Sequence, residues 1–269
     1  MSDRTSPGLR PASSVSEYYE RYWLPPERRP PDVARPQLID TPFPAVARLF
    51  DRWIPGAARC LDVGCGHGHA AGRPLTATGR TYVGVDISAT AVAEARAIGL
   101  DARQIEDAAA LPFADGEFDA VLCLEVLEHV FFPAQVVSEM VRVLKPGGYL
   151  IVTTPNVAYW RRRLDLLLLG RWNPFGYSYA VEQPWGDPHI RFFTAGALRR
   201  LLASSGLEAV QVAGHGGSVL GDIPWIGRRL RKRQASPAYR LLEVQVPSLF
   251  GCFLNGVGRK PDPTRPSET

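Results

Sequence analysis

Three aspartates in the first half of the chain each stand at the end of a short apolar run. Asp62 lies in the first run, Asp86 ends the second (Thr-Tyr-Val-Gly-Val-Asp), and Asp107 ends the third (Arg-Gln-Ile-Glu-Asp). The carboxyl ends of parallel strands share one edge of an open α/β sheet, and ligands bind there. We expect Asp62 to favour an ammonium group, Asp86 to accept hydrogen bonds from a ribose diol, and Asp107 to accept one from an exocyclic amine. Together the acids predict a ligand with an amine, a ribose and an adenine, and no phosphate.

A glycine loop at residues 64–68 (Gly-Cys-Gly-His-Gly) directly follows the first run. Glycines at a strand end allow a tight turn and let the backbone approach a ligand closely. The dinucleotide-binding pattern needs its third glycine where His69 stands, and Asp62 would repel a pyrophosphate, so a nicotinamide dinucleotide is disfavoured. Ile87, next to Asp86, offers an apolar surface to a purine. Taken singly, the loop could be a structural turn and each acid a helix cap, so only their combination indicates a ligand.

Hydrophobic runs of strand length alternate with helical stretches through most of the chain. The predicted strands are Arg59–Val63, Thr81–Val85, Arg103–Asp107, Phe118–Leu124, Tyr149–Thr153, Leu207–Ala213 and Leu249–Gly258. Ser88, Pro133 and Thr194 mark helix starts, because a hydroxyl side chain caps a helix and proline fits its first turn. Two earlier helices are predicted over Val15–Trp23 and residues 44–55. This alternation predicts an α/β fold, with a doubly wound, mostly parallel sheet covered by helices on both faces.

The composition is that of one globular unit, with 269 residues of which 45% are hydrophobic and 22% charged. A net charge of +4 is too small to indicate nucleic acid as a partner. The first residues contain no apolar secretory segment, and the longest aliphatic run, Leu166–Leu169, is too short to span a bilayer. We therefore expect a cytoplasmic protein. The four cysteines include no C-x-x-C pair, which predicts mostly buried thiols and no structural zinc.

Five motifs resemble, in order and spacing, those of the class I S-adenosylmethionine-dependent methyltransferases, in their ubiquinone/menaquinone-type small-molecule branch. The matching segments are LDVGCGHG (61–68), VGVDIS (83–88), DAAALPFADGEFDAVLC (107–123), EVLEHV (125–130) and LKPGGYLIVTTPN (144–156). The resemblance covers about residues 45–215. It implies a seven-stranded Rossmann-like sheet whose last two strands form an antiparallel hairpin at one edge. It also implies S-adenosyl-L-methionine as the cofactor.

For this cofactor, the resemblance implies contacts at successive strand ends. The methionine part would lie on Asp62 and the glycine loop, and the ribose on Asp86. The adenine would lie on Asp107 and the amide of Ala108, and the methionyl ammonium on the backbone that ends the fourth strand. The complete implied set is Asp62, Gly64, Cys65, Gly66, Gly68, Asp86, Ile87, Asp107, Ala108, Cys123 and Leu124.

Two residues depart from the family pattern. Ala109 stands where the family commonly carries an acid, so one polar contact near the adenine would be missing. Pro74 falls in the helix after the glycine loop, where it would remove an internal hydrogen bond and kink the helix. Neither departure alters the loop itself.

Methyl transfer from a sulfonium is an in-line displacement, for which alignment and exclusion of water supply much of the rate. A general base helps when the acceptor is a hydroxyl, and His129 and His189 are the predicted catalytic residues. His129 follows the fourth strand beside the expected methyl position, and His189 precedes a helix at the place where similar enzymes hold the acceptor. Some quinone-pathway relatives bind a divalent metal with residues like Glu125, Glu128 and His129. These side chains could instead only orient the loop, and we assign no metal.

The predicted organisation is one methyltransferase domain, 44–260, between an N-terminal tail with a cap helix, 1–43, and a disordered tail, 261–269. Nine aromatic residues within 159–193 predict a cap over the acceptor pocket or a small satellite core. The segment 221–247 is a basic insertion with five clustered cations, Arg228, Arg229, Arg231, Lys232 and Arg233. We expect these to contact anionic headgroups at a membrane surface or an acidic acceptor, unless they form only a solvated face.

The sequence therefore predicts a methyltransferase that acts on a small-molecule, glycan or lipid-linked acceptor, with oxygen as the expected site. The turn at 154–156 and the segment WRRRLDLLLLG (160–170) are similar to methyltransferases of glycan and secondary-metabolite pathways and to methionine-biosynthesis W proteins. The alternative is a non-catalytic partner protein with the same fold, and a third interpretation is a nicotinamide-dependent oxidoreductase. Nucleic acid is not expected, because no recognition motif accompanies the basic run.

Overall fold

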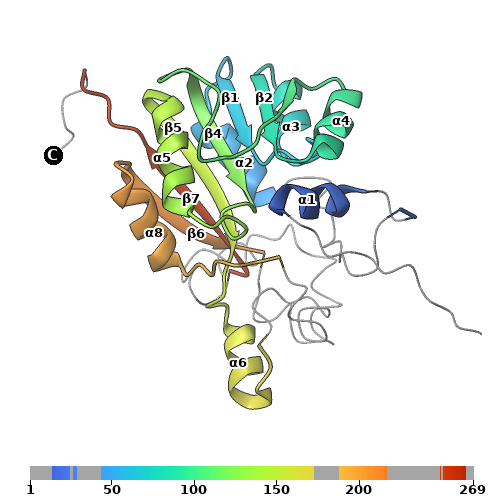
Figure 1. Ribbon diagram of the computed structural model, residues 1–269. Helices are drawn as coiled ribbons and strands as arrows, with labels where there is room; N and C mark the ends of the chain where they lie inside the picture. The colour runs from blue at the N-terminus through green and yellow to red at the C-terminus, as the bar shows by residue number, and fades with distance from the viewer. Residues whose placement is uncertain are drawn as a thin grey trace, which may run out of the picture.

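The computed structural model describes residues 14–24, 27–28, 44–172, 188–216, 249 and 251–264 (Figure 1). In chain order the elements are α1 (Val15–Trp23), α2 (Pro44–Trp53), β1 (Arg59–Val63), α3 (Gly72–Ala77), β2 (Thr81–Asp86), α4 (Ala89–Ala97), β3 (Ala102–Gln104), β4 (Phe118–Leu124), α5 (Pro133–Val143), β5 (Leu144–Pro155), α6 (Trp160–Leu169), α8 (Ala195–Ser204), β6 (Glu208–His215) and β7 (Phe253–Arg259). Among these residues, the seven strands form a single sheet in the order β3-β2-β1-β4-β5-β7-β6.

The sheet has the predicted doubly wound topology. β1 pairs in parallel with both β2 and β4, so the strand order reverses between β1 and β4. In such a sheet a crevice opens at the carboxyl ends of the two strands where the order reverses. β7 runs antiparallel to β5 and to β6, which gives the antiparallel pair expected at one edge.

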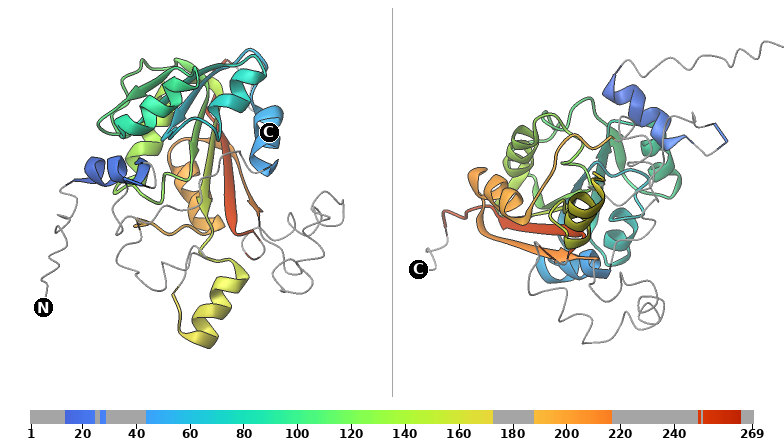
Figure 2. Two further views of the ribbon diagram at one scale, coloured as in Figure 1. Left: turned by 90° about the vertical axis from the view of Figure 1, so that its right-hand side faces the viewer. Right: turned by 90° about the horizontal axis from the view of Figure 1, so that it is seen from below.

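Helices cover both faces of the sheet, as the views in Figure 2 show. Leu61 and Val63 of β1 pack in the same cluster as the buried side chains of α5 and α8. Cys60, which precedes Leu61 in the strand, packs on the opposite face with the buried side chains of α2, α3 and α4. The alternation follows from the period of two in a strand, where successive side chains point to opposite faces. The predicted α/β class is confirmed.

Local capping explains where the helices begin. The hydroxyl of Ser88 accepts a hydrogen bond from the amide of Ala91, and Thr194 does the same for Ala197 at the start of α8. Such bonds satisfy amides that have no partner inside the first helical turn. The predicted helix starts at Ser88, Pro133 and Thr194 are confirmed.

Three local predictions need correction. β3 is shorter than predicted, so Asp107 lies in the loop after the strand and does not end it. β5 is longer than the predicted Tyr149–Thr153, partly because β7 pairs with it from Tyr149 to Pro155. Pro74 causes no kink: it is the third residue of α3, within a first turn whose amides have no intrahelical partner.

Several sequence predictions concern residues outside the described ranges. These include the basic insertion 221–247 with its five cations Arg228, Arg229, Arg231, Lys232 and Arg233, and residues 173–187 of the aromatic segment. Residues 159–172 and 188–193 of that segment are described. Among the described helices, we find none with the length and hydropathy required to cross a bilayer.

Candidate active site

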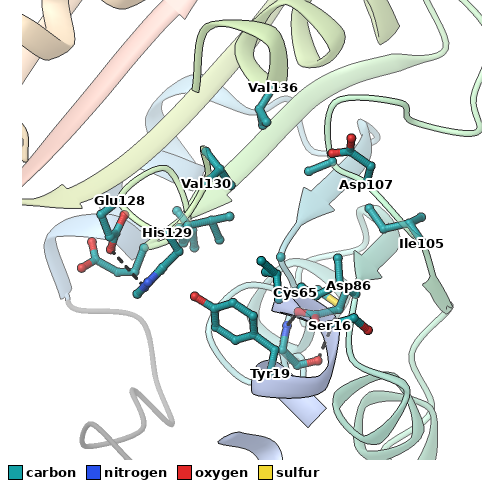
Figure 3. Close-up of a pocket in the computed structure, with 18 of the residues that line it drawn as sticks. Ser16, Tyr19, Cys65, Asp86, Ile105, Asp107, Glu128, His129, Val130 and Val136 are labelled. Atoms are coloured by element: carbon teal, nitrogen blue, oxygen red, sulfur yellow. Dashed lines mark hydrogen bonds and ion pairs between the residues drawn. The ribbon is translucent and has the colours of Figure 1, made fainter. Parts of the chain in front are cut away.

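A cavity of about 520 Å³ lies at the carboxyl ends of β1, β2 and β4. Its walls come from the glycine loop, the end of β2, the loops after β3 and β4, and helix α1 (Figure 3). The predicted cofactor residues that line it are Gly64, Cys65, Gly66, Asp86, Ile87, Asp107, Ala108 and Leu124. Asp62, Gly68 and Cys123 are not part of the wall. The structure therefore gathers most of the predicted set around one space.

All three glycines of the loop, Gly64, Gly66 and Gly68, have positive φ angles and no room for a Cβ atom, and two of them face the site. Gly64 and Gly66 have φ angles of +77° and +52°, in the left-handed region that favours glycine. A Cβ atom on Gly64 would lie 2.3 Å from the side chain of Val126, and one on Gly66 would lie 2.5 Å from the Trp23 ring. The loop is therefore packed closely against both α1 and the segment after β4.

Asp86 is held in place by two backbone amides. Its Oδ2 accepts a hydrogen bond from Gly66 N at 2.9 Å, and its Oδ1 accepts one from Ser88 N at 2.9 Å. Burial raises the pKa of this carboxyl above its usual value, and the two amide bonds act in the opposite direction. Because a carboxylate oxygen can accept more than one hydrogen bond, each oxygen retains capacity for a ribose hydroxyl.

Asp62 lies behind the glycine loop, away from the cavity. Its Oδ2 accepts a hydrogen bond from the hydroxyl of Tyr82 at 2.8 Å, and burial raises its pKa to about 7. Direct contact between this carboxylate and a ligand in the cavity would require the loop to move. In the present arrangement Asp62 supports the loop from beneath, which differs from the direct ammonium contact expected from the sequence.

The side of the cavity where the sequence predicts the adenine is lined by Ile87, Ile105, Asp107 and Ala108. Asp107 Oδ1 accepts a hydrogen bond from the amide of Ala109 at 2.8 Å. The Ala109 side chain provides no second acid here, but its backbone amide orients the carboxylate of Asp107. In Figure 3, Ile105 and Asp107 lie on one side of Tyr19 and Cys65, and Glu128 and His129 lie on the other. The predicted adenine contacts thus lie at one end of the cavity, and the histidines lie at the other, the histidine end.

The chain turns sharply after β4 at Glu125, which has a φ angle of +57°. Its amide donates to the carbonyl and hydroxyl oxygens of Thr153 on β5, which holds the turn in place. Burial raises the pKa of the Glu125 carboxyl to about 7. Positive φ at a residue other than glycine is costly and concentrates at functional sites, so this turn is a feature of the site rather than of the core.

Glu128 is a buried carboxylate whose two oxygens have no hydrogen-bond partner among the described residues. Its exposure is 1%, and its pKa is raised by burial and by the nearby charge of Glu125. Its backbone carbonyl accepts hydrogen bonds from the amides of Ile190 and Arg191. These two bonds hold the segment that carries His189 against the loop that carries His129.

The structure brings together the two predicted histidines. The ring centroids of His129 and His189 are 4.5 Å apart, and both side chains line the cavity. His129 Nδ1 lies 3.2 Å from the carbonyl oxygen of Pro188, and its Nε2 lies 3.8 Å from Glu128 Oε1. Glu128, His129 and His189 offer ligand atoms that all lie within 4.8 Å of one another. Glu125, which the resemblance placed with Glu128 and His129 as a metal ligand, is not in this group.

Helix α1 forms a wall that the sequence located only as a cap helix, without its contact residues. The residues of α1 on the cavity are Val15, Ser16, Tyr19, Tyr22 and Trp23. The Tyr19 ring lies 5.8 Å from that of His129, and the carboxylate of Glu20 accepts hydrogen bonds from Ser88, Ala89 and Thr90 at the start of α4. The aromatic run Glu-Tyr-Tyr-Glu-Arg-Tyr-Trp is the sequence signal from which this wall could have been found.

Comparison with known proteins agrees with this geometry. A family model described as a methyltransferase domain matches residues 35–212. The chain is 32% identical over 217 residues to the ubiquinone biosynthesis O-methyltransferase of Thiobacillus denitrificans, a match that covers 75% of this chain and 84% of that protein. It is 32% identical over 188 residues to a protein of Mycolicibacterium smegmatis named "Probable S-adenosylmethionine-dependent methyltransferase", covering 61% of this chain and 66% of that one.

A solved structure shows the same fold. The SAM-dependent methyltransferase of Thermotoga maritima matches with a TM-score of 0.56 at 21% identity, over 80% of this chain and 87% of that one. Fold, site and family match together define a class I methyltransferase of the α/β type. The chain belongs to the methyltransferase-domain family, and it is an enzyme that uses S-adenosyl-L-methionine as its cofactor. This membership removes the oxidoreductase and the non-catalytic partner as interpretations of the sequence.

Proposed function

We propose that the enzyme methylates a hydroxyl oxygen of a small-molecule, glycan or lipid-linked acceptor held at the histidine end of the cavity. The observation that supports this most is the pairing of His129 and His189, 4.5 Å apart, on the wall of the same cavity as the cofactor residues. A hydroxyl must lose its proton to attack a methyl group, and an adjacent imidazole is the usual acceptor for that proton.

Different residues along the cavity would bind the cofactor and exclude water. Asp86, Asp107 and the glycine loop would hold the cofactor, whose sulfonium supplies an activated methyl group. Trp23 of α1 packs on Gly66 of the glycine loop, Tyr19 lies against His129, and both rings would exclude water from the cavity between the two ends. Alignment in a closed site accounts for a large part of the rate in a displacement of this kind.

The hydrogen-bond pattern of His129 suits a general base. The oxygen of Pro188 can only accept a hydrogen bond, so the contact at 3.2 Å places the ring hydrogen of His129 on Nδ1. In the neutral ring, Nε2 is then the basic nitrogen. The proton taken from the acceptor hydroxyl would be held on Nε2, close to the Glu128 carboxylate, which stabilises the resulting imidazolium.

Two further observations support the choice of acceptor. The relative in Thiobacillus denitrificans is named an O-methyltransferase, which favours oxygen over nitrogen or sulfur. Phe131 and Phe132 line the cavity yet are largely exposed, so they form an apolar rim where the acceptor enters. A rim of this kind favours an acceptor with an aromatic or aliphatic portion.

The test is methyl transfer measured on a panel of phenols, alcohols, amines and thiols with His129→Gln and His189→Gln. We expect the glutamine variant at the working base to lower turnover of a hydroxyl acceptor by about 10²–10⁴-fold, with cofactor affinity almost unchanged. The wild-type rate should fall at low pH, because a protonated imidazole cannot accept a proton. Normal turnover in both variants, or methylation of amines alone, would contradict the proposal.

A second arrangement is favoured by the environment of Glu128. Two buried carboxylate oxygens without a hydrogen-bond partner among the described residues, beside two imidazoles, fit a divalent cation. Glu128, His129 and His189 would hold that cation, and it would lower the pKa of an acceptor hydroxyl. Chelator treatment then abolishes activity, a divalent salt restores it, and Glu128→Gln is as damaging as either histidine variant. Activity that survives chelation would leave the histidines as bases without a metal.

A further inference from the structure

Helix α6 is an arm that extends away from the sheet. Figure 1 and the left view of Figure 2 show it projecting away from the sheet and from the other helices. None of its side chains is buried. At its base, the buried side chain of Asn156 donates to Gly251 O and accepts from Ala158 N, and Val157 N donates to Phe193 O. The arm is therefore anchored to the end of the sheet, while its far end has no packing partner among the described residues.

The far end of α6 is apolar on all sides. Four consecutive leucines close the helix, Leu166, Leu167, Leu168 and Leu169, and all four are exposed, Leu167 to 78% and Leu168 to 70%. With 3.6 residues per turn, four consecutive side chains point in directions about 100° apart and surround the helix. The flat surface of a protein partner covers one side of such a helix. An apolar fluid into which the tip is immersed covers every side.

Charged and aromatic residues stand near the leucines in the pattern of a membrane interface. Between Trp160 and Trp172, the exposed arginines Arg161, Arg163 and Arg171 stand against one acid, Asp165, while a fourth, Arg162, lies over the Tyr159 ring and near Glu125. Trp172 is half exposed and packs edge-on against Phe192. Tryptophan and arginine side chains favour the headgroup layer, and an excess of arginine favours anionic lipid.

We infer that α6 is a membrane-docking element, whose leucine tip inserts end-on into the nearer leaflet of an anionic bilayer. A ten-residue helix is about 15 Å long, half the hydrocarbon thickness, so it can anchor the protein to the surface but cannot span the membrane. Gly170, in the left-handed conformation, ends the helix: its N–H donates a hydrogen bond to Leu166 O, and the N–H of Arg171 donates one to Asp165 O, so the tip keeps its shape.

The position of α6 also relates the bilayer to the active site. β5, whose end leads into α6, contributes Thr153 to the cavity wall, so the arm leaves the same edge of the sheet at which the cavity lies. Resting on the proposed function, this placement narrows the acceptor to a lipid-linked hydroxyl compound, whose apolar tail can stay in the bilayer while its head reaches the apolar rim of Phe131 and Phe132.

The experiment is flotation of the full chain with vesicles of phosphatidylcholine, with and without phosphatidylglycerol. We expect binding only when the anionic lipid is present, and less binding as salt increases. The double variant Leu167→Glu/Leu168→Glu should weaken binding by at least about tenfold, because two leucines no longer enter the bilayer. The matched control Ala93→Glu/Ile98→Glu adds the same charge at exposed positions of α4 and should bind like the wild type.

The possible outcomes separate docking from catalysis. Absence of vesicle binding, or equal binding by the leucine variant, would overturn the inference. A wild-type dimer that the leucine variant converts to a monomer, with no vesicle binding, would show that a second copy covers α6 and would equally overturn it. Methylation of a short water-soluble hydroxyl acceptor should be unaffected by the leucine variant. If no hydroxyl is methylated while vesicles still bind, the proposed function fails and the docking role stands.

Discussion

Asp86 is the residue whose replacement should most directly weaken cofactor binding. Its two oxygens are fixed by the amides of Gly66 and Ser88, and each keeps capacity for a ribose hydroxyl. A hydrogen bond to an ionised group contributes about 1.5–3 kcal/mol. Loss of the charged acceptor in Asp86→Asn should therefore weaken binding of S-adenosylmethionine and of its demethylated product by about 10–150-fold.

Titration calorimetry measures this effect, and two controls separate binding from folding. Glu94→Gln removes a charge from an exposed position of the neighbouring helix α4 and should leave the dissociation constant unchanged. In Asp86→Asn, the new side-chain NH2 group would face one of the two backbone amides of Gly66 and Ser88, and this could destabilise the fold. Thermal unfolding without ligand measures that loss of stability separately from the loss of affinity. Equal affinity of Asp86→Asn and Glu94→Gln, or tight binding of NAD by the wild type, would refute the assignment of Asp86 to the ribose.

Two further predictions concern the glycine loop and its support. Burial raises the pKa of Asp62 to about 7, so the free energy of unfolding should fall as pH rises from about 4 to 7. In Asp62→Asn this fall should shrink, by up to roughly 4 kcal/mol, as chemical denaturation across that range will show; identical slopes would contradict it. Gly66→Ala should place a Cβ against the Trp23 ring, displace α1 and weaken cofactor binding. Gly99→Ala, with a φ angle of +85° and open space around it, is the matched control, so equal behaviour of the two variants in hydrogen exchange over 15–23 would exclude displacement of α1.

The sequence predicts the sheet well because each strand carries its own signal. The bounds of β1 and β4 agree with the prediction at both ends, since a strand buried on both faces is a continuous apolar run between turn residues. β3 was less well predicted because it is short and on the edge, with two exposed residues of its three. With one buried residue in three, β3 has no alternation of buried and exposed side chains from which its bounds could be predicted.

The cofactor end of the site was predictable for the same reason, since its residues follow strands whose ends meet at one edge. The histidine end required the fold. Glu128 and His189 lie far apart in the chain, and contacts between the two segments bring them together, among them the hydrogen bonds from Ile190 and Arg191 to the Glu128 carbonyl. The place of Asp62 behind the loop was missed, although the alternation of the strand indicates it. Asp62 points to the face opposite Leu61 and Val63, where the Tyr82 hydroxyl donates a hydrogen bond to it.

The way in which α1 is attached to the rest of the protein has a consequence for product release. This helix closes the cavity, yet no residue of it is fully buried, and its firmest link to the body is the bond set of Glu20 with the start of α4. Detaching it breaks these hydrogen bonds and exposes the rings of Tyr19, Tyr22 and Trp23, so the free energy of the open state depends on both. Spent cofactor can then leave by brief local unfolding of this one segment while the sheet stays intact. Product escape and protection from water would then depend on the Glu20 contacts and on this aromatic packing, which substitutions in α1 can strengthen or weaken without altering the chemistry at the histidines.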